Sequence, residues 1–340
     1  MINRNKDSGG FIVELFDSLK FKIVRRGIRI AFPEATDTRI LSAVARLKGE
    51  ELVEPILIGK RADIEQAAAV RGISIANMQI YDPNDCDRWD EVVDAFVEVR
   101  KGKATREQAE VLLKDENYFG TMLTHMGITD GLVSGAIHST GDTVRPALQI
   151  IKTKPGISRT SGAFLMMRGN EQEKYLFSDC AINVNPSPQE LAEIAIASAE
   201  TAKMFDIDPK VAMLSFSTKG SAKAPQADAT IEATRIAKEL APDLVIDGEL
   251  QFDAAYNQSV AQLKAPESEV AGKANVYVFP DLQSGNIGYK LAQRLGNFEA
   301  IGPILQGLNK PIADLSRGCI EEDVYKLSII TANQALLNGN

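Results

Sequence analysis

The segment IRIAF at residues 28–32, followed by VEPILIG at 53–59 and MQIYD at 78–82, decides the fold. Each is a short, mainly apolar run, which predicts a strand. Between them, TDTRILSAVARLKG at 36–49 and RADIEQAAAVRG at 61–72 carry apolar residues at helical spacing. Strands that alternate with helices indicate a parallel, doubly wound α/β sheet. The apolar runs are nearly continuous, which is typical of strands buried on both faces.

The same alternation continues through the rest of the chain. DGLVSG at 130–135 predicts a strand that ends in a glycine turn, and KTKPGISRTSG at 152–162 is a turn-rich candidate for a domain boundary. SGAFLMM at 161–167 and KYLFSDCAIN at 174–183 predict a pair of strands across a polar turn. A last helix from about Ile320 can return to the first domain, which would make that domain discontinuous. Further strands are predicted within KVAMLSFST (210–218), DLVIDGEL (243–250) and ANVYVFPD (274–281).

The composition is that of an ordinary globular protein of about two domains. The chain has 340 residues, of which 44% are hydrophobic and 25% charged. Its 38 Lys and Arg residues and 46 Asp and Glu residues give a net charge of -8, which lacks the basic footprint of a nucleic-acid-binding protein. No apolar run approaches the roughly 18 residues of a membrane helix. The stretch MINRNKDSGGFIVELFDSLKFK at 1–22 has only short apolar runs, so we expect no signal peptide.

Cysteine and histidine are scarce. Cys86, Cys180 and Cys319 are odd in number and lack paired spacing, so neither a disulfide framework nor a cysteine-rich zinc site is expected. This usage predicts a reducing, cytoplasmic compartment. The two histidines, His125 and His138, are too few for a metal site built from histidine, so no metal is expected.

The most informative polar segment is LNKPIADLSRGCIEEDVYKL at 308–327. Ser316, Arg317 and Gly318 form a polar turn directly before a predicted helix. A helix N-terminus offers free backbone N–H groups and the positive end of the helix dipole, so it can bind an anion. Arg317 adds a planar, permanently charged fork that suits a phosphate. The alternative is ordinary capping, because acidic residues in a first turn favour the helix dipole in any protein.

The acidic residues of this helix differ in their expected shelter from solvent. Asp323 lies about 60° from Ile320 on the helical wheel, nearer the apolar stripe than Glu321 or Glu322. We therefore expect Asp323 to be the most sheltered of the three. The apolar stripe is formed by the residues that share one side of the helix at about 100° per residue: Ile320, Val324, Leu327 and Thr331.

Other strand–loop–helix junctions carry weaker signals. GAIHSTGDTVRPALQIIK at 135–152 contains Arg145, which is either an anion-binding residue or a solvated helix residue. His138 lies beside Ser139, but neighbours in sequence seldom serve as base and nucleophile, so a hydrolase is disfavoured. Two loops match neither the P-loop nor the G-x-G-x-x-G fingerprint, and ordinary loop chemistry is favoured for each: LSFSTKGSAK (214–223) and FPDLQSGNIGYKLAQRL (279–295).

Several residues are ambiguous when taken alone. In the last of these loops, glycines around Asn286 can let a ligand approach the backbone. Arg39 and Arg100 each fit a surface position. Cys180 and Cys319 have no obvious His partner, so buried small hydrophobic side chains are a better interpretation than nucleophiles.

At these segments the sequence resembles the phosphate acetyltransferase (phosphotransacetylase) family. The resemblance covers nearly the whole chain, including PEATDTR at 33–39, and the segments occur in the family's order. The matching stretches are DGLVSGAIHSTGDTVRPALQIIK (130–152), KVAMLSFSTKGSAKA (210–224), DLVIDGELQFDAA (243–255), GKANVYVFPDLQSGNIGYKLAQRL (272–295) and GPILQGLNKPIADLSRGCIEEDV (302–324).

The resemblance implies two doubly wound α/β domains, similar to the fold of isocitrate and isopropylmalate dehydrogenases. The first domain is expected to contain residues 1–153 plus 302–340 and the second residues 154–301, with the active site in the cleft between them. A homodimer is also implied. The chain looks like the family's compact class, because it is too short for the N-terminal regulatory domains of the longer class.

The resemblance also implies site residues. By position, the family's catalytic aspartate matches Asp323, and its active-site serine and neighbouring arginine match Ser316 and Arg317. Cys180 is assigned no role. The family's substrate-binding arginines match Arg145, Arg100 and Arg39.

The implied reaction is the reversible transfer of an acetyl group between acetyl phosphate and coenzyme A. The CoA thiolate attacks the acetyl carbonyl directly in a ternary complex, so CoA is a substrate and no cofactor is expected. Acetyl phosphate, acetyl-CoA, CoA and phosphate are then the partners, with no nucleic acid and no membrane.

The proposed base raises an energetic question. A reference thiol with a pKa near 8.5 and an Asp with a pKa near 3.9 differ by about 4.6 units, so full proton transfer would cost roughly 6 kcal/mol. We expect burial to raise the pKa of Asp323, arginines to lower that of the thiol, or proton transfer to accompany the attack. Ser316 is expected to donate to the developing oxyanion or the phosphate, and Arg317 and Arg145 to hold the phosphoryl group.

Three other functions compete with this one. Phosphate butyryltransferase has the same chemistry and a wider acyl pocket. A 2-hydroxy-acid dehydrogenase shares the fold, but its metal-binding aspartates and Lys–Tyr pair are not evident in the matched segments. A non-catalytic sensor of acyl-CoA or acetyl phosphate is disfavoured because Ser316, Arg317 and Asp323 occur together.

Overall fold

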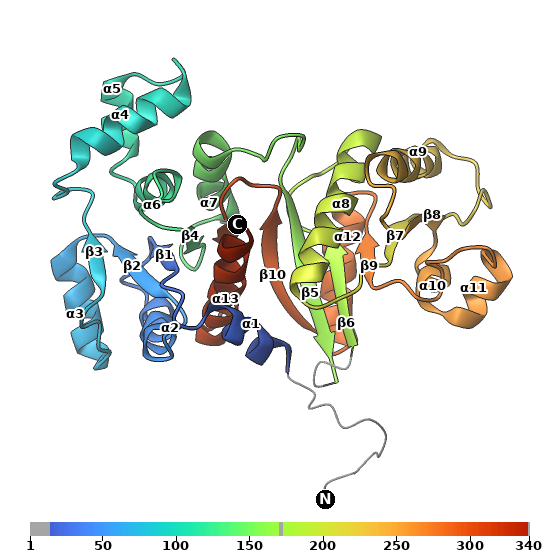
Figure 1. Cartoon of the computed structure of the whole chain (residues 1–340), viewed down its shortest axis with the longest axis horizontal. Helices are drawn as coiled ribbons and strands as arrows, with labels where there is room; N and C mark the ends of the chain where they lie inside the picture. Colours follow the sequence, from blue (N-terminus) through green and yellow to red (C-terminus); the bar gives the residue numbers. More distant parts are fainter. Residues whose placement is uncertain (1–13, 170–172, 339–340) are drawn as a thin grey trace, which may run out of the picture.

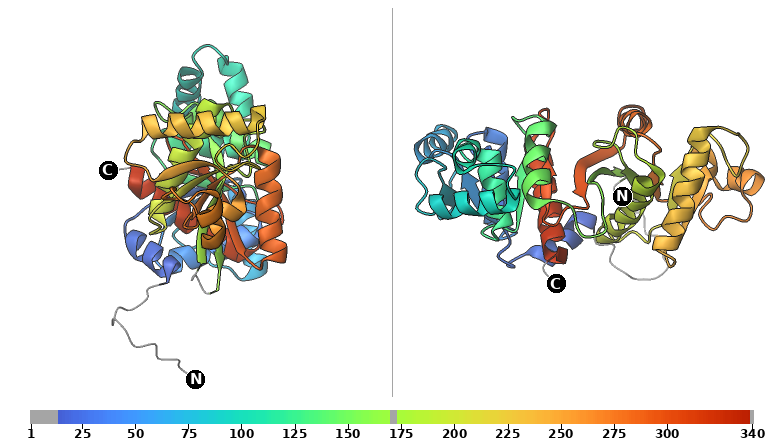
Figure 2. Two further views of the ribbon diagram at one scale, coloured as in Figure 1. Left: turned by 90° about the vertical axis from the view of Figure 1, so that its right-hand side faces the viewer. Right: turned by 90° about the horizontal axis from the view of Figure 1, so that it is seen from above.

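The structure is a computed structural model that describes residues 14–169 and 173–338 (Figure 1). Residues 1–13, which form most of the N-terminal stretch considered for a signal peptide, lie outside these ranges. Within them, eleven strands form one sheet in the order β3-β2-β1-β4-β11-β10-β5-β6-β9-β7-β8. Helices cover both faces of this sheet (Figures 1 and 2).

The first part of the sheet is parallel throughout, as the apolar runs of the first half predict. Side chains alternate between the faces, since Ile30 and Phe32 of β1 enter one hydrophobic cluster and Ala31 enters another. The strands of this part are β3 (Gln79–Tyr81), β2 (Glu54–Ile58), β1 (Arg29–Phe32), β4 (Gly131–Ser134) and β11 (Ile312–Asp314).

The centre of the sheet is antiparallel. The strand pair expected around residues 161–183 is confirmed as β5 (Ser161–Arg168) and β6 (Glu173–Ser178). The neighbouring β10 (Glu299–Gln306) was not among the predicted strands. Its apolar pattern is interrupted by Gly302 and Pro303, and the pairing register shifts between Ile301 and Ile304.

The outer part of the sheet is parallel again and consists of β9 (Val276–Val278), β7 (Val211–Leu214) and β8 (Ile246–Leu250). These strands are shorter than their predicted segments. In KVAMLSFST at 210–218, for example, only the first four residues after Lys210 pair in the sheet, and the hydroxyl-rich end forms a loop.

One face of the sheet is covered by a single hydrophobic cluster that runs through both halves of the chain. The last helix, α13, lies at the centre of the molecule between the two halves (Figures 1 and 2). The helices on this face are α1 (Leu15–Ile23), α2 (Thr38–Gly49), α3 (Arg61–Arg71), α8 (Pro188–Met204), α9 (Pro225–Leu240) and α13 (Glu321–Asn338).

The opposite face has two separate clusters instead of one. The first lies under α4 (Trp89–Arg100), α5 (Arg106–Leu112), α6 (Glu116–His125), α7 (Thr140–Pro146) and the π-helical turn Ala147–Ile151. The second lies under α10 (Phe252–Tyr256), α11 (Gln258–Lys264) and α12 (Leu282–Leu295).

The chain is therefore a mixed α/β protein built on one large sheet. The predicted domain limits fall close to the join between its halves: 153/154 precedes β5, and 301/302 lies inside β10. The return of α13 to the first half is confirmed by its packing on α2 and β4. The division of the chain into two domains stays a prediction.

Candidate functional site

A pocket with a volume of about 690 Å³ lies where the two halves meet. The β11–α13 loop and the loop before α7 contribute to its wall from one side, and α12 from the other. Its polar and charged lining residues include His138, Thr140, Asn286, Tyr289, Lys290, Arg294, Asp314, Ser316, Arg317 and Asp323.

Three of the predicted site residues are brought together in this wall: Ser316, Arg317 and Asp323. The Ser316 hydroxyl accepts a hydrogen bond from the Gly318 N–H at 3.2 Å, and an Asp323 carboxylate oxygen accepts one from the Ile320 N–H at 2.9 Å. Ser316, Arg317 and Asp323 are exposed. Arg317 lines the pocket, and its guanidinium makes no hydrogen bond or ion pair with any residue in the described part of the chain.

The expected shelter of Asp323 is wrong. Asp323 is exposed, whereas Glu321 and Glu322 are half-buried beside Arg46. The helix begins at Glu321, so Ile320 precedes it, is 63% exposed and does not belong to the apolar stripe. Within the first turn only Asp323 lines the pocket, whereas the stripe residues Val324, Leu327 and Thr331 are buried.

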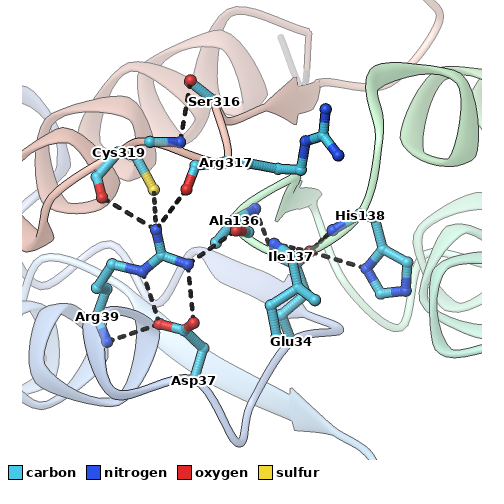
Figure 3. A network of polar contacts seen from close by, with 10 residues as sticks. Glu34, Asp37, Arg39, Ala136, Ile137, His138, Ser316, Arg317 and Cys319 are labelled. Carbon is cyan, nitrogen blue, oxygen red and sulfur yellow. Dashed lines mark hydrogen bonds and ion pairs between the residues drawn. The ribbon is translucent and has the colours of Figure 1, made fainter.

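Arg39 lies behind this loop and is fully bonded (Figure 3). Its Nε and one Nη donate to the Asp37 carboxylate at 3.0 and 2.8 Å. The other three N–H groups donate to backbone carbonyls of Arg317, Cys319 and Ala136 at 2.9, 3.0 and 2.8 Å. A guanidinium has five N–H donors, so none is left for a ligand in this conformation. Arg39 therefore ties two loops of the pocket to the start of α2.

Glu34 organises the second of these loops. Its side chain is 0% exposed and accepts hydrogen bonds from the N–H groups of Ala136, Ile137 and His138 at 2.7 to 2.8 Å. It also pairs with His138 Nδ1 at 2.8 Å. Burial acts to raise the pKa of Glu34, but these hydrogen bonds outweigh it and hold the pKa below its usual value. The same contact raises the pKa of His138.

The His138–Ser139 pair considered for a hydrolase does not form. His138 is bonded to Glu34, and the Ser139 hydroxyl donates to Asp142 at 2.6 Å as part of a capping box of α7. The geometry of these two residues therefore also disfavours a hydrolase.

Asp314 is a pocket residue that sequence reasoning missed. It ends β11, is 1% exposed and lines the pocket beside Leu315. Burial raises its pKa to about 6, which makes it the sheltered carboxyl that Asp323 was expected to be. A carboxylate at the end of a three-residue strand has no periodic pattern around it, so only its position after PIA could have suggested it.

Arg145 and Arg100 are not among the residues that line the pocket. Both act electrostatically on the Tyr118 hydroxyl, which donates to Gln149 at 3.1 Å. Arg145 is exposed on α7 and its guanidinium reaches back to Gly141. One Arg100 Nη donates to the Gln149 carbonyl at 3.4 Å. The two arginines thus place positive charge around Tyr118 and form a second basic group there.

The two candidate cysteines are buried small side chains, as expected. Burial raises the pKa of Cys319 to about 11 and holds the pKa of Cys180 well above its usual value. A thiol with a raised pKa is a poor nucleophile. The geometry therefore gives neither of them the environment of a reactive thiolate.

The two glycine-containing loops have different positions. Residues 214–223 lie near β8, where Lys219 pairs with Asp247 at 2.6 Å, away from the pocket. In the other loop it is the protein's own backbone that approaches a glycine: a Cβ on Gly285 would lie 2.2 Å from the Asp179 carbonyl oxygen. This close approach seats α12 on the β6–α8 segment and places Asn286 in the pocket wall.

Comparisons with known proteins agree over the length of the chain. The family model described as "Phosphate acetyl/butaryl transferase" matches residues 14–332. A phosphate acetyltransferase from Bacillus subtilis (strain 168) is 60% identical over 325 residues, which cover 96% of this chain and 100% of that protein. No helix in residues 14–169 and 173–338 combines the length and the apolar character needed to cross a bilayer.

Solved structures show the same fold. A phosphotransacetylase from Streptococcus pyogenes has a TM-score of 0.93 and 63% identity, covering 95% of this chain and 98% of that one. The EutD phosphotransacetylase from Staphylococcus aureus has a TM-score of 0.89 and 54% identity, covering 94% and 98%. The chain therefore belongs to the phosphate acetyl/butaryl transferase family.

Proposed function

We propose that this chain is a phosphate acetyltransferase, which transfers an acetyl group reversibly between acetyl phosphate and coenzyme A. The observation that carries this proposal is the convergence of Ser316, Arg317 and Asp323 in one pocket, in a chain 60% identical to a phosphate acetyltransferase. Acetyl phosphate, acetyl-CoA, CoA and phosphate are the proposed partners. The reaction needs no cofactor, because CoA is itself a substrate.

The CoA sulfur attacks the acetyl carbonyl carbon, and the bond from that carbon to the phosphate oxygen breaks. Asp323 accepts the thiol proton. Asp323 is exposed, and full transfer of a proton from a reference thiol to a reference carboxylate would cost roughly 6 kcal/mol. We therefore assign a proton transfer that accompanies the attack, aided by the positive charge of Arg317.

Ser316 and Arg317 act on the charge that develops during the attack. The Ser316 hydroxyl accepts from the Gly318 N–H, which leaves its proton free to donate to the developing oxyanion. The free guanidinium of Arg317 offers a bidentate fork to the phosphoryl group. Both residues follow a buried strand, so the core fixes the loop that carries them.

The remaining arginines are proposed to bind substrate. Arg145 and Arg100 supply the second basic group, around Tyr118. Arg39 was predicted to bind substrate as well, but its five donors are already bonded. We assign its contribution to the loops that it holds.

The cleft is proposed to lie between two α/β domains of a fold similar to isocitrate and isopropylmalate dehydrogenases, with residues 1–153 plus 302–340 in one and 154–301 in the other. Two observations support this division. The hydrophobic clusters on one face are separate, and the pocket is lined from both halves. We also propose a cytoplasmic location, which rests on the cysteine usage.

A homodimer is proposed, and α12 offers the surface for it. Ile287, Leu291 and Leu295 recur every four residues and are exposed, so the outer face of the helix carries an apolar stripe. Light scattering on the purified protein is expected to give twice the chain mass, and Leu291→Asp to give one chain mass. A monomeric wild-type protein at micromolar concentration would contradict this proposal.

The function is tested by measuring thioester formation from CoA and acetyl phosphate by ultraviolet absorbance, with butyryl phosphate as the paired substrate. Rapid turnover of acetyl phosphate is expected. Preference for butyryl phosphate would keep the mechanism and change the acyl group. Binding of CoA by a folded protein that turns over neither substrate would favour the sensor.

A further inference from the structure

The proposed reaction must place a proton on the departing phosphate. CoA enters as a thiol and acetyl phosphate as a dianion, so the balanced products are acetyl-CoA and hydrogen phosphate. Without a proton the leaving group would be the phosphate trianion, which is a far stronger base. Asp323 takes a proton from the thiol in this scheme and has none to give at the start. The site therefore needs an acid on the phosphate side.

His138 has the geometry of such an acid. It lines the pocket together with Thr140, Ser316 and Arg317. Its Nδ1 is held by Glu34 at 2.8 Å, so the free edge of the ring is the one that carries Nε2. Within the described residues Nε2 has no hydrogen-bond partner. Figure 3 shows the Arg317 side chain extending from its loop toward the side of the site on which the imidazole lies.

Glu34 is built to fix this orientation. Three backbone N–H groups of the loop that ends in His138, and the ring itself, converge on its two buried oxygens. A buried carboxylate on one imidazole nitrogen sets the tautomer and stabilises the protonated ring, as in catalytic triads. An ordinary surface ion pair leaves its carboxylate partly exposed, whereas the Glu34 side chain is 0% exposed.

The charges around His138 favour the imidazolium. The hydrogen bond that His138 donates to Glu34 is the largest cause of its raised pKa, opposed by partial burial. Asp115 and Glu116 at the start of α6 act in the same direction. Asp142 on α7 also interacts with the ring. The raised pKa increases the share of imidazolium, the form in which Nε2 carries a proton on the pocket side.

We propose that His138, oriented by Glu34, is the general acid that protonates the departing phosphate; this rests on the proposed acetyl transfer. The sulfur–carbon bond forms as the bond between the acetyl carbon and the phosphate oxygen breaks. The electron pair of the broken bond stays on that oxygen, which takes the Nε2 proton. His138 becomes neutral and keeps its Nδ1–H on Glu34. Asp323 then releases its proton to solvent, and His138 regains one from solvent.

The first test is His138→Gln, whose amide can donate a hydrogen bond but cannot release a proton. We expect kcat for thioester formation to fall by about 100-fold, with the KM for acetyl phosphate changed less than about threefold. The alkaline limb of the wild-type kcat–pH profile should disappear. The matched control is His125→Gln, because His125 lies at the far end of α6 outside the pocket lining. That control should keep both the rate and the profile.

The second test is Glu34→Gln, which retains an acceptor oxygen but removes the charge. We expect the alkaline limb to move to lower pH, since the carboxylate that raises the His138 pKa is gone. Added to His138→Gln, it should leave the pH profile of that variant unchanged, because the ring whose pKa Glu34 raises is gone.

The proposal is overturned by a wild-type kcat or an intact alkaline limb in folded His138→Gln, or by a rise in KM alone. If that variant does not fold, an unmoved limb in Glu34→Gln overturns it. Failure of the proposed function gives a different result, because the wild-type protein would then form no thioester.

Discussion

Arg39, at the start of α2, bonds the loop that carries Arg317, yet the first guanidinium is saturated and the second is free. Arg39 donates all five N–H groups to the protein, whereas the Arg317 guanidinium has no partner within the described residues. The saturated group fixes backbone, and the free group is available for a phosphate. We call Glu34, Asp37 and Arg39 the support network, and Ser316, Arg317 and Asp323 the cleft face. Residue type alone does not distinguish these two roles.

The largest effect is expected at the cleft face. Asp323→Asn removes the proposed base but keeps an oxygen that can accept from the Ile320 N–H. We expect kcat to fall by about 10²–10⁴-fold, with little change in either KM, because proton transfer is lost but binding is not. Steady-state thioester formation measures this. Glu321→Gln, on the same helical turn but facing Arg46, is the control and should stay near wild-type activity.

The support network should give a smaller effect of a different kind. Arg39→Lys keeps the charge but cannot make five hydrogen bonds, so the loops at Ala136 and Arg317 lose partners. We expect kcat to fall by about 10- to 100-fold and the melting temperature to drop, because a small displacement of the cleft face is costly. A raised KM with unchanged kcat and stability would instead make Arg39 a direct substrate ligand.

Arg145 extends the comparison. Within the described residues its guanidinium has no hydrogen-bond or ion-pair partner, yet it lies outside the pocket wall. Arg145→Ala is expected to raise the KM for acetyl phosphate by about tenfold, which corresponds to roughly 1.4 kcal/mol. Initial rates with each substrate varied in turn provide the measurement. A selective loss of CoA affinity would show that the basic group formed with Arg100 serves the other substrate.

The smallest effect is expected at Glu116. Its side chain is half-buried, but it has no hydrogen-bond partner among the described residues, unlike the side chains of the support network. Burial raises its pKa to about 7, above the ordinary 4.5. The folded chain then holds a proton that the unfolded chain releases, so stability falls as pH rises from about 4.5 to 7. Glu116→Gln should raise the melting temperature at pH 8 by about 1–3 °C. An equal rise at pH 4 would contradict this cause.

Much of the fold was predictable from local pattern. Nearly uninterrupted apolar runs such as IRIAF predict buried parallel strands. β1, β2 and β4 lie within such runs, as predicted. β10 escaped because Gly302 and a bulge break its pattern. β11 was missed because its three residues lie in the polar stretch NKPIADLS, which contains no long apolar run. Antiparallel pairing at the centre depends on contacts between distant segments.

The proximity of three predicted site residues was predictable from their order in the sequence, while their roles stay predictions. Ser316, Arg317 and Asp323 come from one loop and one helical turn, and a resemblance over that segment identifies them together. The burial of residues 320–323 was predicted wrongly, because the helical wheel included Ile320, which precedes the helix and is exposed. Glu34 and His138 are more than one hundred residues apart, so no local pattern could pair them.

The unbroken hydrophobic cluster on one face has a consequence for how the protein unfolds. Residues of β1, β5 and β7 belong to the same cluster, so neither half can expose its side of the sheet without disrupting the other. Melting followed by calorimetry should therefore give one cooperative transition that includes both halves. The pocket lies between the two halves, whereas the free energy of unfolding depends on both halves together.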